Sequence, residues 1–278
     1  MQLHLTFHPV VSPVDLPIHH NHILQGLVYD LMGPRVSDFV HNGGFRTGRR
    51  TMRLFAFSRL LGVYHMDKAA GRIRFQGDVG LILASPIDDV LTQWATSLAG
   101  KGKAMLGNNE LEIVRIGVEA PKATGNELTV SALSPVVVYS TLYRQDGSPY
   151  TCYFEPEEPA FNRLVSLNLR HKAEALGRIV GPEDSVEVRP LGRCRRVILR
   201  YKGAVIKGVV GDFHLSGPSY LLDLVLDAGL GAKNSQGFGL CVPRPSMAYV
   251  PRLPKTGAPQ AAVERADGAT DAANVNHE

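Results

Sequence analysis

The sequence predicts a protein of the α+β class with two domains that share one order of strands and helices. Three observations lead to this prediction: an order of strand, helix, strand, strand, helix, strand in the first half, a similar order in the second half, and a short polar segment between them. The chain has 278 residues, of which 44% are apolar. It can therefore bury a sizeable core, and its length suits two domains of about 120 residues each.

The first half opens with a strand, because apolar and polar side chains alternate over residues 2–8. His4 and His8 lie on the polar side of this strand, where we expect them to face solvent. A helix is expected next, with apolar side chains at helical spacing over residues 23–31, Asn21 as its N-cap and Gly33-Pro34 as its stop. The later segments are a short helix or turn at 35–40, an extended stretch at 52–58, strands at 73–75 and 79–84, a helix from 85 to about 99, and a strand at 111–118. The order βαββαβ is the ferredoxin-like plan, and we assign residues 1–119 to this N-terminal domain.

The second half repeats this plan after a polar joint at residues 120–126, which carries no apolar period. Its expected segments are a strand at 128–139 with an interruption at Ser134-Pro135, a hairpin at 143–154, a helix at about 159–176, strands at 185–189, 196–201 and 205–215, a helix at 218–226, and an edge strand at 239–242. We assign residues 127–250 to the C-terminal domain. Residues 251–278 are rich in small and polar side chains and lack periodicity, so we expect a disordered tail.

Composition and charge exclude several classes of protein. The 30 basic and 26 acidic residues leave a net charge of +4, so a polyanionic partner would have to be met by local clusters of basic residues. Cys152, Cys194 and Cys241 stand singly, which argues against a disulfide framework or a zinc site and fits a reducing compartment. The N-terminus lacks the pattern of a signal peptide, and no apolar run approaches the roughly 20 residues that cross a bilayer. We therefore expect a soluble, cytoplasmic protein.

The segment GLGAKNSQGFG, residues 229–239, concentrates four glycines around five small or polar residues. A phosphate-binding P-loop does not fit, because Lys233 follows the wrong glycine, and a dinucleotide fingerprint would need a glycine where Asn234 stands. A helix-terminating turn would explain Gly229 and Gly231, but it leaves Gly237-Phe238-Gly239 unexplained. We expect these glycines to adopt left-handed backbone or to approach another backbone or a ligand closely.

The spacing of this segment, Gly-apolar-Gly, five residues and Gly-apolar-Gly, resembles the C-terminal glycine-rich loop of the repeat-associated superfamily of CRISPR proteins. Within that superfamily the chain resembles the sixth CRISPR-associated (Cas) family, the endoribonucleases that cut repeat RNA into guide RNAs. Three further segments agree with the resemblance: HNHILQGLVYDLM at 20–32, RLFAFS at 53–58 and LSPVVV at 133–138. The resemblance covers residues 1 to about 245.

This resemblance implies two ferredoxin-like domains that face each other, with the glycine-rich loop against RNA in the cleft between them. The implied partner is CRISPR repeat RNA, together with subunits of an effector complex, and the implied protein is a monomer or a homodimer. It implies an enzyme that needs no metal or other cofactor, since the ribose 2′-hydroxyl attacks its own phosphate and leaves a 2′,3′-cyclic phosphate and a 5′-hydroxyl. Such a site must move two protons and neutralise charge on phosphorus, tasks for which histidine and arginine are well suited.

Three residues resemble the Tyr, His and Lys triad of the family, namely Tyr29, His41 and Arg53, which are spaced at intervals of twelve residues. Arg53 departs from the pattern, because arginine keeps the charge but cannot donate a proton, so we expect a purely electrostatic role. Tyr29 would orient the nucleophile, and His41, close to Gly43-Gly44, would transfer protons. His20 and His22 are the reserve candidates for this role. A metal site at His19, His20 and His22 has no supporting carboxylate or cysteine pattern.

Basic residues gather in two further places that suit RNA phosphates. Arg46, Arg49, Arg50 and Arg53 share one loop, and residues 189–202 include Arg193, Arg195 and Arg196 among six basic side chains. The lone Trp94 falls within a helical pattern and is expected in the core. The expected RNA-binding residues are Gly229, Gly231, Lys233, Asn234, Ser235, Gln236, Gly237, Gly239, Arg193, Arg195, Arg196 and Arg49.

Two other functions are open at this point. A subunit of a CRISPR effector complex with the same fold could bind RNA without cutting it, and it would not need His41. A ferredoxin-like metabolic enzyme or regulator unrelated to RNA would show no salt-sensitive binding to repeat RNA.

Overall fold

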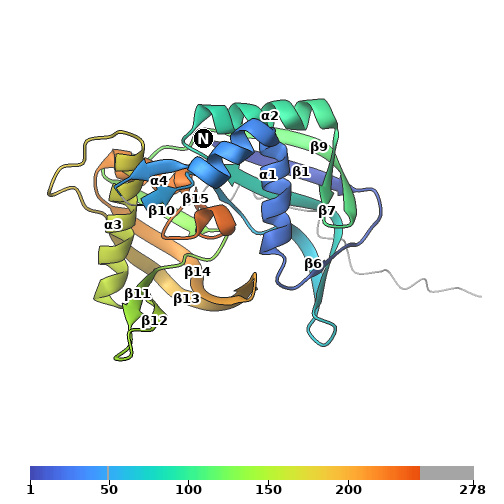
Figure 1. Cartoon of the computed structure of the whole chain (residues 1–278). Helices are drawn as coiled ribbons and strands as arrows, with labels where there is room; N and C mark the ends of the chain where they lie inside the picture. Colours follow the sequence, from blue (N-terminus) through green and yellow to red (C-terminus); the bar gives the residue numbers. More distant parts are fainter. Residues whose placement is uncertain (49, 245–278) are drawn as a thin grey trace, which may run out of the picture.

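A computed structural model describes residues 1–48 and 50–244 of the chain. Figure 1 shows the two halves of the chain side by side, each with a β-sheet and helices packed on it. The expected tail at 251–278 and Arg49 lie outside the described residues. We propose residues 120–126 as the joint between the two halves.

The first half contains a seven-stranded sheet and two helices. Its core order of strands is β9-β1-β7, and β2, β5 and β6 also pair with β7. The sequence of elements β1, α1, β6, β7, α2, β9 is the expected βαββαβ plan. The helices are α1 (Asn21–Asp38) and α2 (Asp88–Lys101), and the strands are β1 (Gln2–Pro9), β2 (Val14–Pro17), β5 (Ala56–Phe57), β6 (Leu61–Asp67), β7 (Arg72–Ala84), β8 (Lys103–Leu106) and β9 (Asn109–Glu119).

The second half repeats the plan with a four-stranded sheet in the order β13-β14-β10-β15. Its helices are α3 (Pro159–Ala175) and α4 (Ser219–Ala228), and its strands are β10 (Glu127–Ala132), β13 (Glu187–Tyr201), β14 (Ala204–Ser216) and β15 (Cys241–Pro243). Two short hairpins stand apart from the sheets: β3 (Phe45–Thr47) with β4 (Arg50–Met52), and β11 (Tyr139–Tyr143) with β12 (Pro149–Tyr153). The predicted tandem ferredoxin-like architecture is confirmed, including the edge strand β15 that follows the glycine-rich segment.

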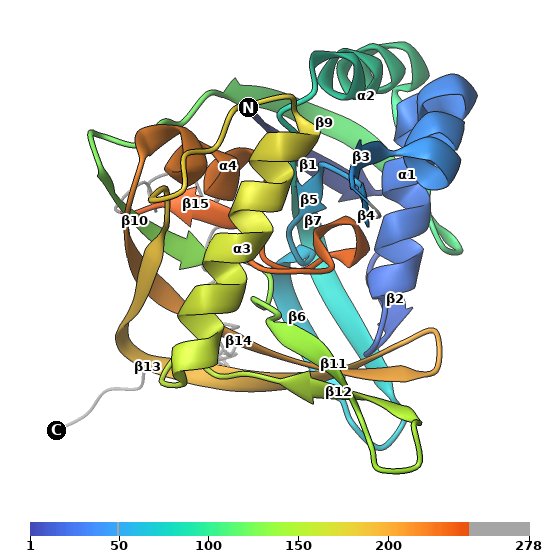
Figure 2. The ribbon, with the colours of Figure 1, turned by 60° about the vertical axis from the view of Figure 1, so that its left-hand side comes forward.

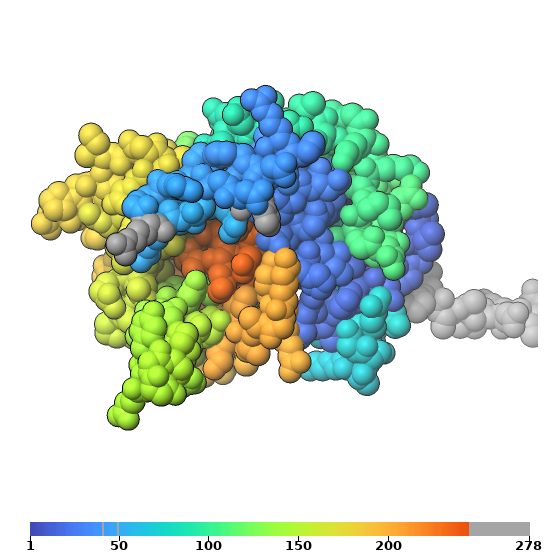
Figure 3. Space-filling model, viewed as in Figure 1, coloured from blue at the N-terminus to red at the C-terminus, as the bar shows by residue number. Residues whose placement is uncertain are grey.

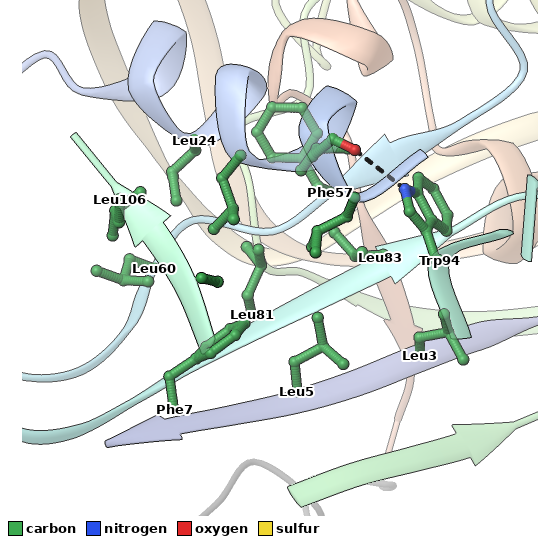
Figure 4. Close-up of a cluster of buried hydrophobic side chains, with 14 of the residues drawn as sticks. Leu3, Leu5, Phe7, Leu24, Phe57, Leu60, Leu81, Leu83, Trp94 and Leu106 are labelled. Atoms are coloured by element: carbon green, nitrogen blue, oxygen red, sulfur yellow. Dashed lines mark hydrogen bonds between the residues drawn. The ribbon is translucent and has the colours of Figure 1, made fainter. Parts of the chain in front are cut away.

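The core of the first half lies between its sheet and its two helices. Leu3, Leu5 and Phe7 of β1 are buried there, as their alternation predicts. Trp94 is fully buried, and its Nε1 donates a hydrogen bond to the backbone oxygen of Val28 at 3.1 Å (Figure 4). Each large apolar side chain buried in this way contributes about 1.5–3 kcal/mol to folding. The expectation that Trp94 belongs to the core is therefore confirmed.

Several segments differ from the sequence expectations. The strand β6 was not predicted, although it forms a hairpin with β7, and β7 is one strand where two were expected at 73–75 and 79–84. The expected strands at 185–189 and 196–201 are likewise parts of one strand, β13, whose register shifts between Leu191 and Arg195. In both β7 and β13, the alternation of apolar and polar side chains is interrupted at an irregular point within one long strand, and we had expected a loop there.

Two polar residues near the N-terminus also differ from expectation. The N-cap of helix α1 is His20, whose side chain makes no capping hydrogen bond, and not Asn21 as expected. Asn21 is the first helical residue, and its carboxamide donates a hydrogen bond to the glycine-rich segment instead. His4 is buried, not solvent-facing, because its side of the sheet packs on the second half of the chain. That burial lowers the pKa of His4, and nearby Glu119 opposes the shift. His8 is exposed as expected and contacts Asp78.

The two halves are joined by buried polar and apolar contacts. The Gln2 Nε2 atom donates to the backbone oxygens of Leu226 and Cys241, both at 2.9 Å, and Ser134 Oγ donates to the backbone oxygen of Phe57 at 3.1 Å. A small apolar cluster of Ala56, Ile82, Ala84, Leu240 and Val242 packs beside them. These contacts fix one half against the other. Among the described residues, no helix has the length and apolar composition needed to span a bilayer.

Candidate functional site

A cavity of about 650 Å³ lies between the two halves of the chain. Four basic side chains line it, those of Arg50, Arg53, Lys172 and Lys233, and its described lining contains no aspartate or glutamate. In Figure 3, the glycine-rich segment, in orange-red, lies in the hollow below the first-half residues drawn in blue. The lining residues are 50–54, 137–141, 231–236, Leu164, Leu167, Asn168 and Lys172. Such a surplus of positive charge favours an anionic ligand.

The β3–β4 hairpin forms one wall of this cavity and reaches across to helix α3 (Figure 2). Thr47 Oγ1 donates to Glu174 at 3.0 Å, and Arg50 Nη1 donates to His171 Nδ1 at 3.2 Å. Burial, and then the charge of Arg50, lower the pKa of His171, which keeps its Nδ1 able to accept this bond. The basic segment that the sequence singled out is thereby held over the cavity by the second half.

The glycines of the segment 229–239 allow close packing within the protein. All four have left-handed φ angles, between 69° and 85°. A Cβ atom on Gly239 would lie 2.0 Å from the backbone oxygen of Leu230, and one on Gly237 would lie 2.6 Å from Cε2 of Phe57. The expected left-handed backbone and close approach are both present, and the approach is to atoms of the chain itself.

Helix α1 holds this glycine-rich segment from the first half. Asn21 Nδ2 donates to the backbone oxygens of Gln236 and Gly237, at 3.1 and 3.2 Å, and Gln25 Nε2 donates to that of Ser235 at 2.7 Å. Within the segment, Asn234 Nδ2 donates to the backbone oxygens of Leu230 and Phe238. The Asn234 amide group therefore stabilises the conformation of the segment itself, whereas we had expected it to contact RNA.

Lys233 and Tyr139 form a cation–π pair on the cavity wall. The Lys233 Nζ atom lies 4.8 Å from the centre of the Tyr139 ring. Lys233 has a left-handed φ of 62°, and burial lowers the pKa of its ammonium. The ring stabilises the half-buried charge in this position.

Lys172 extends from α3 beneath the glycine-rich segment and is fully buried. Its Nζ donates to the backbone oxygens of Ala228, Gly229 and Gly231, at 3.2, 2.6 and 3.2 Å. Burial lowers its pKa to about 7. Only the ammonium form can supply three N–H donors, so the protonation of Lys172 is coupled to the end of α4 and the start of the segment. Sequence reasoning missed this residue, because a single lysine on a helix gives no signal of burial.

Tyr29 and Arg53 of the expected triad come into electrostatic reach of each other. Tyr29 lies half-buried on α1, with its ring edge-on to Phe55 at 5.6 Å between centroids. Burial raises the pKa of Tyr29, and the charge of Arg53 opposes the shift. Burial also raises the pKa of Tyr201, at the end of β13, and the charge of Arg53 opposes this shift too. The Tyr201 hydroxyl donates a hydrogen bond to Gln25 Oε1. Nothing in the linear pattern singles out Tyr201, which is one aromatic residue at the end of a basic strand.

The backbone of His41 belongs to a π-helical turn, η1 (Phe39–Gly43), which directly precedes the β3–β4 hairpin. The side chain of His41 lies outside the described part of the structure. The turn follows α1, which is interrupted at Gly33 (φ 70°), as the expected stop at Gly33-Pro34 indicated. The segment that carries His41 is therefore continuous with both Tyr29 and the hairpin that leads to Arg53.

The other histidines near α1 lie away from the described lining of the cavity. His20 is buried, its Nδ1 contacts the backbone oxygen of Pro17 at 3.0 Å, and its ring packs edge-on against Phe75. Burial lowers its pKa. His22 is exposed, and His19 Nδ1 accepts a hydrogen bond from the backbone N–H of Arg200 at 3.4 Å.

The basic residues of β13 form a surface separate from the cavity lining. Arg193, Arg195 and Arg196 are exposed on this edge strand, and Arg196 forms an ion pair with Glu155. Arg195 lies close enough to Arg59 to lower its pKa, an effect smaller than that of Arg59's own burial. Of the residues expected to bind RNA, the structure brings Gly231, Lys233, Asn234, Ser235 and Gln236 to the cavity and leaves the β13 arginines outside it.

Comparisons with known proteins agree with this architecture. Residues 118–242 match the family described as CRISPR associated protein Cas6, C-terminal. The CRISPR-associated endoribonuclease Cas6 1 of Methanocaldococcus jannaschii is 23% identical over 235 residues, which cover 82% of this chain and 87% of the relative. The solved structure of a Cas6-related protein from Pyrococcus furiosus has a TM-score of 0.74 at 20% identity, covering 87% of this chain and 98% of that one.

A third similar protein, a RAMP protein described as binding different RNA substrates, has a TM-score of 0.72 at 20% identity and covers 87% of this chain and 99% of its own. The resemblance predicted from the sequence is thus confirmed: residues 118–242 carry the sequence pattern of the Cas6 C-terminal domain, and the described chain has the fold of Cas6 proteins.

Proposed function

We propose that the protein is an endoribonuclease that cuts CRISPR precursor RNA within its repeats, without a metal ion, to produce guide RNAs. The observation that carries this proposal is the cavity between the halves, lined by the charged side chains of Arg50, Arg53 and Lys233 and by no carboxylate among its described residues. Phosphodiester groups are the polyanions that such a lining favours. The similar Cas6 endoribonuclease of Methanocaldococcus jannaschii supports the nuclease activity, and the similar RAMP protein that binds different RNA substrates supports RNA as the ligand.

The absence of carboxylates from the described lining also supports chemistry that does not depend on a bound metal. Magnesium and calcium ions in proteins are held mainly by carboxylate and carbonyl oxygens, and nucleases that use two metals rely on such ligands. We propose that the ribose 2′-oxygen attacks the adjacent phosphorus while the bond from phosphorus to the 5′-oxygen breaks. The 2′-hydroxyl loses its proton, the departing 5′-oxygen gains one, and a 2′,3′-cyclic phosphate and a 5′-hydroxyl result.

We assign His41 to the proton transfers, because an unperturbed imidazole is populated in both forms near neutral pH. The raised pKa of Tyr29 keeps its hydroxyl protonated there, so Tyr29 serves as a hydrogen-bond donor that orients the reacting group. Arg53, on the cavity wall, stabilises the charge that develops on the phosphate oxygens with its planar fork of N–H donors.

The test is a cleavage assay with end-labelled repeat RNA in the presence of EDTA. The proposal predicts cleavage at one position, a cyclic phosphate on the upstream fragment, and no cleavage when the nucleotide at that position carries a 2′-deoxyribose. RNA that is bound but stays intact would instead support the non-cutting subunit of an effector complex. Cleavage that stops in EDTA and returns with added Mg²⁺ would contradict the metal-independent mechanism.

A further inference from the structure

Two side-chain oxygens on the cavity wall are buried without a hydrogen-bond partner. These are Oδ1 of Asn168, on α3, and Oε1 of Gln236, in the glycine-rich segment. Neither oxygen is accessible to solvent, and neither has a partner within the described ranges 1–48 and 50–244. Buried polar atoms are nearly always paired in native proteins, so two orphaned acceptors in one cavity indicate a ligand that supplies donors.

Both side chains are carried by backbone that is already fixed. The backbone N–H of Gln236 donates to the backbone oxygen of Lys233 at 2.9 Å, and its own backbone oxygen accepts from Asn21. Asn168 lies within helix α3, one turn from Lys172. Because neither residue depends on a ligand for its backbone position, the unpaired oxygens are set in place before anything binds.

The other lining residues suit a planar ring attached to a phosphate. Leu164, Leu167 and Tyr139 offer apolar surface, while Arg50 and Arg53 offer charge for a phosphate group. The volume of about 650 Å³ is in the range of sites for small organic groups. Two acceptor oxygens require N–H donors, which the exocyclic amino groups of cytosine, adenine and guanine provide. Uracil has a carbonyl oxygen in place of the cytosine amino group and offers only its single ring N3–H, so it would leave at least one of the two acceptors unpaired.

We propose that this cavity binds an unpaired nucleobase that carries an exocyclic amino group, with Asn168 and Gln236 as the residues that select it. This inference rests on the proposed function and adds a specificity to it: the RNA has a flipped-out or single-stranded cytosine or purine beside the bound phosphate. Selection by hydrogen bonds to a base edge is the common way for proteins to read single-stranded RNA.

The experiment compares ten-nucleotide oligo(C) and oligo(U) by fluorescence anisotropy in EDTA, since the two bases differ only in the group on C4 and the proton on N3. The wild-type protein should bind oligo(C) more tightly by roughly tenfold. Asn168→Leu and Gln236→Met should each reduce this ratio toward one through weaker binding of oligo(C). Asn168→Leu should also leave the melting temperature equal or higher, because it removes a buried acceptor that the folded protein does not pair.

Asn162→Leu is the matched control on the same helix. Asn162 Oδ1 accepts a hydrogen bond from the backbone N–H of Val188, so its loss should lower the melting temperature and leave the oligo(C) to oligo(U) ratio unchanged. Equal wild-type affinity for both oligonucleotides, or a preference that survives in both cavity variants, would overturn the base site. If repeat RNA is still cut in that case, the nuclease proposal stands; if the protein neither binds nor cuts RNA, both proposals fail.

Discussion

Replacement of Lys172 by methionine should change how the stability of the protein depends on pH. Methionine has a similar length and no charge, so it fills the space of the lysine side chain without an ammonium group. Burial lowers the pKa of Lys172 from 10.5 to about 7 in the folded protein. Between these two values the unfolded chain binds a proton that the folded chain does not, so the free energy of unfolding of the wild-type protein rises with pH.

The size of the effect follows from the same two pKa values. From pH 7 to pH 9 the wild-type free energy of unfolding should rise by about 2 kcal/mol relative to Lys172→Met. Other groups cancel in this difference. The Cys241 thiol beside Lys172, whose pKa is raised to about 12 by burial, stays protonated in the folded protein over this range, and its titration in the unfolded chain is the same for both proteins. Urea denaturation of both proteins at pH 7, 8 and 9 measures it. A constant difference across this range would show that the three backbone oxygens keep the ammonium charged and would refute the argument.

Three further predictions concern the triad and the glycine-rich segment. His41→Ala should lower the single-turnover cleavage rate by roughly 10²–10⁴-fold while the Kd for repeat RNA changes by a few-fold at most; a normal rate would move the role to His20 or His22. Arg53→Met should lower the slope of log Kd against log salt concentration by about one, as expected for one lost phosphate contact, and an unaltered slope would place Arg53 outside the RNA site. Gly237→Val should lower the melting temperature strongly, since its Cβ would lie 2.6 Å from Cε2 of Phe57. Gly147→Val is the control, because Gly147 has a similar φ but no atom within 4 Å of the added Cβ, and its melting temperature should fall less. Equal decreases in melting temperature would contradict this packing argument.

The sequence was sufficient to predict the elements whose periodicity is local. The alternation in β1 predicts a strand and the spacing over residues 23–31 predicts a helix, and the structure confirms both elements. The glycine spacing of 229–239 likewise predicted left-handed backbone, because few other residues adopt it without strain. Strand β6 was missed because most of its side chains are exposed, which leaves no apolar alternation to detect.

The features that sequence could not predict depend on contacts between distant segments. Gln2 and Asn21 are ordinary polar residues in a linear pattern, yet both donate to backbone oxygens of the second half. His4 and Lys172 were not expected to be buried, since the partners that cover them lie far away in the chain. The same holds for Asn168 and Gln236, which lie far apart along the second half of the chain and line the same cavity.

In the proposed complex, RNA lies in the cavity between the halves with its scissile phosphate against Arg53. A structure of the protein with repeat RNA that carries a 2′-deoxyribose at the cleavage position tests it most directly. The scissile phosphate should contact the Arg53 guanidinium, next to the segment that carries His41. A phosphate seated instead along the exposed arginines of β13, with the cavity empty of RNA, would contradict it.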